Sequence, residues 1–311
     1  MADAIITSTN VGSGGEKSLM TLLADYFVES LRHRGSLIPF VNTDAMATLA
    51  AYGNTARILL APDVAYAGAI AGNDGEALVK DNTVGTPIDI VLNQYKHRTI
   101  GYSPLVVELQ GSKSTMPMQI NASVTAIINA INADIAAVVT SGFSSNSGGT
   151  YNTALTDAVM RAAATTMLEK TPAGSQLYGF LKPDANAWGA LLNTSTFRDW
   201  SVLGKESPIV SPNYGSMVQW HGVNWSVSQS VHKATNNTDN FIFARDAIGV
   251  AMKAPKLPDN YAGLNAMDPI SGAEFQIVKY TDPSTLSEVV TVRALYGVSV
   301  LKETYGYLLK S

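Results

Sequence analysis

The chain contains no cysteine among its 311 residues. This absence excludes disulfides, thiolate metal sites and cysteine nucleophiles, and it fits folding in a reducing compartment. Charge is also scarce, because Asp, Glu, Lys and Arg make up 15% of the residues, against a usual share of about 25%. A large chain with so few charges is expected to bury much of its surface against other protein, unless its many Ser, Thr and Asn supply a polar surface instead.

Basic clusters are missing as well. The formal net charge is −4 and the pI is about 5.6. A protein that grips nucleic acid through its phosphates needs a basic patch, so the sequence argues against this class. The first residues, Met-Ala-Asp-Ala, lack the basic and apolar pattern of a signal peptide, and we therefore expect the chain to fold in a cytoplasm.

A glycine-rich stretch, GSGGEKS at residues 12–18, raises the possibility of a phosphate site. A P-loop needs a glycine immediately before its lysine, and Glu16 occupies that place. A carboxylate there repels phosphate. The favoured interpretation is an N-terminal arm whose glycines lead into an amphipathic helix over residues 16–34, and a soluble α/β enzyme with a phosphate-binding loop at 12–18 is the weaker alternative.

Groups that could carry catalysis are scattered. The four histidines (His33, His97, His221 and His232) show no metal-ligand spacing, and no GxSxG nucleophile motif is present. The carboxylates are few and spread along the chain. The sequence therefore predicts no catalytic residue, no cofactor and no metal site, and it predicts that the protein is not an enzyme.

The clearest expected element is a long amphipathic helix within residues 114–142, with Pro117 in its first turn and Gly142 at its end. Its apolar stripe is formed by Ile120, Val124, Ile127, Ile128, Ile131, Ile135 and Val138. At 1.5 Å per residue this rod is about as long as a bilayer core is thick. A membrane span is not expected, because Asn121, Asn129, Asn132 and Asp134 would need partners in lipid.

The remaining elements follow in a definite order. Residues 83–110 predict a long exposed hairpin or strand-loop-strand, with Lys96, His97 and Arg98 at its tip. After the helix we expect a Gly/Ser joint at 143–152, a helix over 153–170 capped by Thr153, a strand at 175–181, and a short helix at 184–193 capped by Asp184. Strands are then predicted at 221–231, 241–252 and 298–311, and a hairpin over 274–297 turns at 282–284.

This order resembles the major capsid protein of tailed bacteriophages, which has the HK97-like fold. Four stretches carry the resemblance: IDIVLNQYKHRTIGYSPLVVELQGSKSTMPMQINASVTAIINAINADI, LYGFLKPDANAWGALLN, GSMVQWHGVNWSVSQSV, and NFIFARDAIGVAMKAP together with RALYGVSVLKETYGYLL. They are similar to the extended E-loop with the spine helix, the axial domain, the segment leaving that domain, and the closing strands of the peripheral domain. The order of these patterns is more specific than any one of them.

The resemblance implies an α+β fold with four parts. These are an N-terminal arm (1–55), an E-loop (75–112), a peripheral domain with the spine helix (113–150 and 236–311), and an axial α/β domain (151–235). Residues implied in subunit contacts are Leu22, Tyr26 and Phe27 on the arm, and Lys96, His97 and Arg98 at the loop tip.

The implied function is structural. Copies of the chain would form pentamers and hexamers of an icosahedral head shell, which is assembled in the host bacterial cytoplasm, becomes part of the virion, and encloses double-stranded DNA without reading its sequence. Implied partners are a separate scaffolding protein, a portal and a decoration protein, with no membrane. An encapsulin-type cargo shell is the alternative with the same fold.

Overall fold

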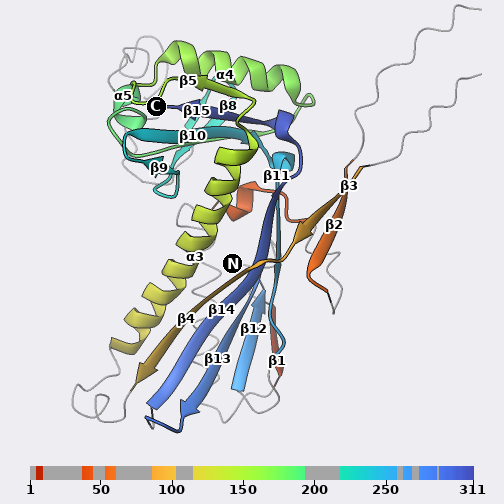
Figure 1. The fold of residues 1–311 in the computed structure, drawn as a ribbon, viewed down its shortest axis with the longest axis vertical. Helices are drawn as coiled ribbons and strands as arrows, with labels where there is room; N and C mark the ends of the chain where they lie inside the picture. The colour runs from red at the N-terminus through yellow and green to blue at the C-terminus, as the bar shows by residue number, and fades with distance from the viewer. Residues whose placement is uncertain are drawn as a thin grey trace, which may run out of the picture.

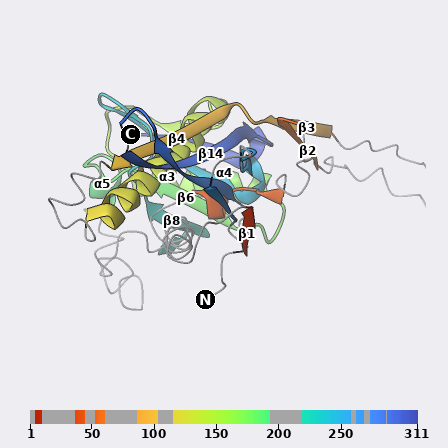
Figure 2. The same ribbon diagram turned by 90° about the horizontal axis from the view of Figure 1, so that it is seen from below.

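The computed structural model describes residues 5–9, 37–44, 53–60, 86–102, 115–192, 218–257, 262–267, 273–285 and 287–311. A long sheet and a lobe built around a second sheet are linked by one long helix (Figure 1). A two-stranded hairpin projects from the side of the molecule away from that helix (Figures 1 and 2). The mixed α and β class that the sequence predicts is confirmed.

The long helix α3 (Thr115–Gly142) lies where the sequence predicts it. Its buried apolar residues with described side chains are Ile127, Ile128, Ile131, Ile135, Ala136 and Val139. The stripe ends on Val139 rather than on the predicted Val138, which is only half-buried. A step of four residues from Ile135 returns to the same helix face, and this step places Val139 against the core.

Part of α3, Thr125–Gly142, is long and apolar enough to cross a membrane by length and composition. Within it, Asn132 is buried, and its side-chain oxygen accepts a hydrogen bond of 2.9 Å from the backbone N–H of Leu37. Leu37 itself belongs to a short segment that packs between α3 and both sheets. These contacts are those of a core helix, as the polar residues of the sequence predict.

The long sheet contains six strands. In spatial order they are β1 (Ile5–Thr9), β12 (Ala262–Met267), β13 (Glu274–Asp282), β14 (Ser287–Val300) and β11 (Ile248–Lys253), with β4 (Gln94–Tyr102) along the other edge of β14. The predicted hairpin over 274–297 is confirmed, since Asp282 pairs with Ser287. Its turn is held by the Asp282 carboxylate, which accepts from the backbone N–H of Ser284 at 2.9 Å.

The lobe is built around a second sheet of seven strands. In order these are β5 (Ser147–Gly149), β15 (Gly306–Lys310), β10 (Asn237–Ala244), β6 (Leu177–Leu181), β8 (Val223–Val227) and β7 (Val218–Trp220), with β9 (Lys233–Ala234) paired to β10. Helices α4 (Asp157–Lys170) and α5 (Trp188–Leu192) accompany it. The strands expected near 175–181, 221–231 and 241–252 are all present, the last divided into β10 and β11.

Two details of the lobe differ from the expectation. Helix α4 is capped by Thr156, whose hydroxyl accepts from the backbone N–H of Val159, and Thr153 lies outside the helix. The second sheet also includes β5, β10 and β15, which the expected division places in the peripheral part. These strands pair with β6 and with each other, and such long-range pairings leave no local signal in sequence.

The projecting hairpin consists of β2 (Thr55–Leu60) and β3 (Thr86–Val91), which pair antiparallel. The sequence predicts a hairpin or a strand-loop-strand within 83–110. Two successive strands are present there, β3 and β4, but they do not pair as a hairpin. Strands β3 and β4 follow each other directly, but β3 pairs with β2, whereas β4 pairs with β14. Alternation located the two strands correctly and could not identify their partners, which lie far away in the chain.

Candidate assembly surfaces

The residues predicted to make subunit contacts fall into two groups. Leu22, Tyr26 and Phe27 lie outside the residues that the structure describes, as does the GSGGEKS stretch. Lys96, His97 and Arg98 are described, and they do not lie at the tip of a loop. They sit inside β4, where their backbones pair with Ala294, Arg293 and Val292 of β14. The expected loop-tip location is therefore wrong, whereas their role in contacts between subunits stays a prediction.

Lys96 faces α3 and pairs with it. Its ammonium lies 3.2 Å from the carboxylate of Asp134, and the hydroxyl of Tyr296 on β14 donates to the same carboxylate. Burial of the tyrosine ring and this hydrogen bond raise the pKa of Tyr296. Asp134 is the only charged residue in α3, so this cluster joins the helix to both strands. A lone charge in an apolar helix was the sequence signal that could have located it.

The two faces of β4 carry different side chains. Tyr95 and His97 lie on the face away from α3, with their ring centroids 5.6 Å apart, and Tyr95 is 48% exposed. Arg98 lies on the face towards α3, like Lys96, because residues two apart in a strand share a face. The three predicted contact residues are therefore divided between the two faces of the strand.

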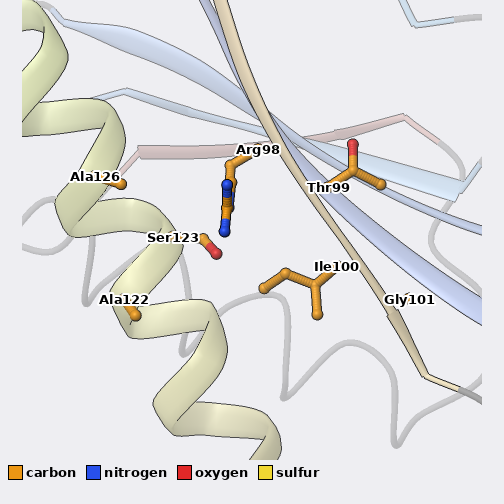
Figure 3. Close-up of a pocket in the computed structure, with 7 residues that line it drawn as sticks. All are labelled: Arg98, Thr99, Ile100, Gly101, Ala122, Ser123 and Ala126. Carbon is orange, nitrogen blue, oxygen red and sulfur yellow. The ribbon is translucent and has the colours of Figure 1, made fainter.

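A hollow of about 400 Å³ lies between β4 and α3. Its lining comes from residues 98–101 of β4 and from Ala122, Ser123 and Ala126 of α3. Figure 3 shows the side chain of Arg98 leaving the strand and extending across this space towards the helix. Apart from Arg98 and the Ser123 hydroxyl, the side chains that face the helix side of the strand are apolar, whereas the Thr99 side chain lies on the other side of the strand (Figure 3).

The projecting hairpin is held together by an exposed ion pair. Arg57 on β2 and Asp89 on β3 form two parallel hydrogen bonds of 2.7 and 2.9 Å. The hydrogen bond from Arg57 lowers the pKa of the Asp89 carboxyl despite some desolvation. On the opposite face, Ala56 and Ile90 are buried against residues of β11 and the segment after β14. The base of the hairpin is thus anchored, and its far end points away from the body (Figure 1).

A second polar cluster lies where α3 enters the lobe. The buried carboxylate of Asp239 on β10 accepts from the Tyr151 hydroxyl at 2.7 Å and lies 2.8 Å from Nδ1 of His232. Thr140, in the last turn of α3, also donates to it at 3.3 Å. Burial, together with the hydrogen bond to Asp239, raises the pKa of Tyr151 to about 12. The cluster ties the end of the helix to the second sheet.

Among the described residues, no three His, Asp or Glu side chains are grouped as a metal site would require. The three described histidines, His97, His221 and His232, lie on different elements, and His221 is 3.3 Å from the carboxylate of Asp157 at the start of α4. The polar clusters of the described part thus join elements of the fold to one another.

The sequence matches no protein-family model and none of the curated proteins. Solved structures are similar to it in fold. The structure titled "Mycobacterium phage Che8" has a TM-score of 0.60 at 14% identity, covering 88% of this chain and 90% of its own. The "Capsid structure of the Cyanophage P-SCSP1u" has a TM-score of 0.56 at 14% identity, covering 84% of each chain. The chain has the HK97-like capsid fold.

A third solved structure with a similar fold is described as a virus-like particle and not as a phage capsid. The "Crystal structure of virus-like particle from Pyrococcus furiosus" has a TM-score of 0.50 at 8% identity, covering 94% of this chain and 98% of its own. The resemblance expected from the order of elements is thus confirmed at the level of fold. Because the sequence identities are so low, single residue patterns would not have revealed this resemblance, and the order of the elements was needed.

Proposed function

We propose that the chain is the major capsid subunit of a tailed bacteriophage, which assembles with copies of itself into an icosahedral head shell around double-stranded DNA. The observation that carries this proposal is the fold match with a phage capsid, which extends over most of both chains. A match of this extent leaves little of the chain for a separate catalytic domain. In this proposal the protein is structural and is not an enzyme.

The surface of the molecule supports assembly with other copies. Charged residues are few, and the exposed large hydrophobic side chains among the described residues are Val91, Tyr95 and Leu168. Val91 and Tyr95 flank the point where the hairpin joins the long sheet. Apolar side chains next to a projecting element are favourable to bury against a neighbour.

The parts of the fold receive the following proposed roles. The hairpin of β2 and β3, with residues 61–85 between its strands, is the E-loop, so that we move this loop upstream from the expected 75–112. The arm is the segment before it, and α3 is the spine helix. The long sheet is the peripheral domain. The axial domain is the lobe, enlarged by β5, β10 and β15 because they belong to its sheet.

The proposal includes partners and location. Copies form pentamers and hexamers, and a separate scaffolding protein, a portal and a decoration protein complete the head. Assembly takes place in the cytoplasm of the host bacterium, and the product is the virion capsid. The acidic net charge of −4 suits a shell that encloses DNA without binding it tightly.

Expression of the chain in bacteria, followed by negative-stain electron microscopy, tests this function. We expect closed shells of uniform diameter, because the subunits bury matching surfaces in a closed symmetry. The matched control deletes residues 61–85 and joins β2 to β3 by a short turn. This control keeps the body of the subunit and is expected to lose the shells. Shells that form equally well without the segment would contradict the role of the hairpin.

The second candidate is a cargo shell of the encapsulin type, which the similarity to the Pyrococcus furiosus virus-like particle favours. Particles purified from the native organism distinguish the two. Nuclease-resistant double-stranded DNA inside the shell supports the phage capsid, whereas an enclosed protein without DNA supports the cargo shell.

A further inference from the structure

We propose that residues 37–44 form a strap that fixes the orientation of the lobe relative to the long sheet. The segment includes the short 3-10 helix η1 (Ile38–Phe40), which lies beside α3 and below the lobe (Figure 1). This short segment contacts the long helix, the lobe and the long sheet. Release of the strap leaves the lobe free to turn.

The lobe and the long sheet are joined by three passages of the described chain. The end of α3 leads into β5, β10 leads into β11, and β14 leads into β15. Two of these passages touch each other, because the backbone N–H of Leu301 after β14 donates to the carbonyl of Ala247 between β10 and β11 at 2.8 Å. Ala247 belongs to a second short 3-10 helix, η4 (Arg245–Ala247). A contact that holds η4 therefore holds two of the three passages.

The C-terminal half of the strap binds both polar residues of η4. The side-chain amide of Asn42 donates to the carboxylate of Asp246 at 2.8 Å, and the guanidinium of Arg245 lies 3.6 Å from the carboxylate of Asp44. The backbone of Asn42 also forms hydrogen bonds of 2.9 Å in both directions with the first residues of β11. Asn42 is buried, so its side chain needs these partners.

The N-terminal half of the strap binds the helix and the lobe. The backbone N–H of Leu37 donates to the side-chain oxygen of Asn132 on α3. The ring of Phe40 lies 4.9 Å from that of Tyr178 and 5.6 Å from that of Phe180, both on β6 of the lobe. Aromatic pairs at these distances attract each other beyond the area that they bury. The strap thus ties β6 to α3 and to η4.

The apolar core is the other feature that could set the orientation of the lobe. One cluster of buried side chains includes residues of both parts, such as Phe241 of the lobe and Ile135 of α3. Apolar contacts are not directional, so they favour burial without selecting one angle between the parts. The buried hydrogen bonds of Asn42 and Asn132 are directional, and they select one position.

The strap also has a distinctive place in the chain. It follows the predicted arm and precedes β2 of the projecting hairpin. A pull on either extension therefore reaches the lobe through the strap. In a shell, where neighbours hold both extensions, this consequence rests on the proposed function.

Distances between pairs of spin labels test the strap, since the natural chain has no cysteine that would take up a label. Ala162→Cys on α4 and Thr281→Cys on β13 are both at exposed positions, and this pair reports the distance from lobe to sheet. Ala133→Cys, exposed on α3, with Thr281→Cys reports the distance from helix to sheet and is the control pair. Dilution with an excess of unlabelled chain removes distances between copies.

Phe40→Ala and Asn42→Ala are each expected to broaden the lobe-to-sheet distribution about twofold or more, because the lobe then samples several orientations. The control pair should keep the width that it has in the parent. Met160→Ala opens a cavity in the separate core beneath α4 and is the matched control substitution. It should leave both distributions narrow.

A lobe-to-sheet distribution of the same width in the parent and in both strap variants overturns the inference. Broadening of both pairs alike also overturns it, because the strap would then support the core as a whole. Neither result bears on the proposed function, which is scored separately by whether the parent chain forms shells.

Discussion

Asp134 carries the only charge of α3, and two strands depend on its carboxylate. Lys96 reaches it from β4 and Tyr296 from β14, so one side chain fixes both strands against the helix. The two contacts differ in strength. The ion pair is about one-third exposed on each side and is screened by water, whereas the tyrosine is fully buried and needs an acceptor.

Substitutions of Asp134 separate these contacts. Asp134→Asn keeps an acceptor oxygen for Tyr296 and is expected to cost about 1 kcal/mol or less. Asp134→Ala leaves the buried hydroxyl without its acceptor and is expected to cost about 1–3 kcal/mol. Urea unfolding of the unassembled subunit measures both. Equal losses for the two variants would show that the tyrosine does not depend on this carboxylate.

Tyr151 gives the stability of the lobe a dependence on alkaline pH. Its pKa is raised to about 12 in the folded chain, above its ordinary value of 10.0, because burial and the hydrogen bond to Asp239 favour the neutral hydroxyl. The stabilisation is complete below about pH 10, where the unfolded tyrosine is also neutral. It is lost as the pH rises towards 12, because the unfolded chain then ionises first.

Tyr151→Phe tests this dependence. The variant should be less stable below pH 10, because Asp239 loses a donor, and its stability should fall less steeply between pH 10 and 12 than that of the parent. Urea midpoints at pH 9, 10, 11 and 12 measure the two curves, and Tyr95→Phe at the exposed tyrosine is the control. Parallel curves for Tyr151→Phe and the parent would contradict the assignment.

At the scale of elements, the projecting hairpin of β2 and β3 approaches β14 closely at Gly297, where only a glycine fits. A Cβ at Gly297 would collide with the backbone carbonyl of Val91 at the end of β3. Backbone atoms cannot turn aside as a side chain can. The close approach of β3 and β14 therefore sets where the hairpin leaves the body.

Gly297→Ala is expected to lower the free energy of unfolding by about 1–3 kcal/mol, the usual effect of overpacking. Gly101→Ala in β4 is the matched control, since the nearest atom to its new methyl group would be 3.8 Å away, at an ordinary contact distance. Urea unfolding compares the two variants. If both lose the same stability, the close crossing at Gly297 does not constrain the hairpin.

Thr156 distinguishes the observed start of α4 from the expected one. Thr156→Ala removes the hydroxyl that accepts from Val159 and is expected to cost about 1 kcal/mol, as N-cap losses do. Thr153→Ala, at the cap that the sequence predicts, should cost less. Thermal unfolding measures both changes. A larger loss for Thr153→Ala would contradict the observed cap.

These elements show what sequence reasoning can and cannot reach. The helix α3 and the hairpin of β13 and β14 were predictable, because periodicity and a tight turn are local signals. The partner of β4 was not predictable, because β4 pairs with a strand far away in the chain. Thr99 on β4 and its neighbour Thr291 on β14 are 192 residues apart. A hairpin of β3 and β4 would have its tip near Lys96, His97 and Arg98. The structure instead pairs β4 with β14, which places these three residues inside a strand.

At the scale of the whole molecule, the few charges and the hairpin that leaves the body fit the proposed role of a subunit that its neighbours cover. The fold is shared with phage capsids over most of the chain. The body has its own core between the long sheet and α3. Assembly is therefore expected to join subunits that are already folded.

The mass of the purified protein in solution tests this account most directly. Sedimentation velocity at increasing protein concentration should show a sharp, fast boundary from a species whose mass is many times the 32.9 kDa of one chain. Any remaining protein should sediment as small oligomers. A single species of 32.9 kDa that persists at the highest concentrations, with and without its proposed scaffolding partner, would contradict it.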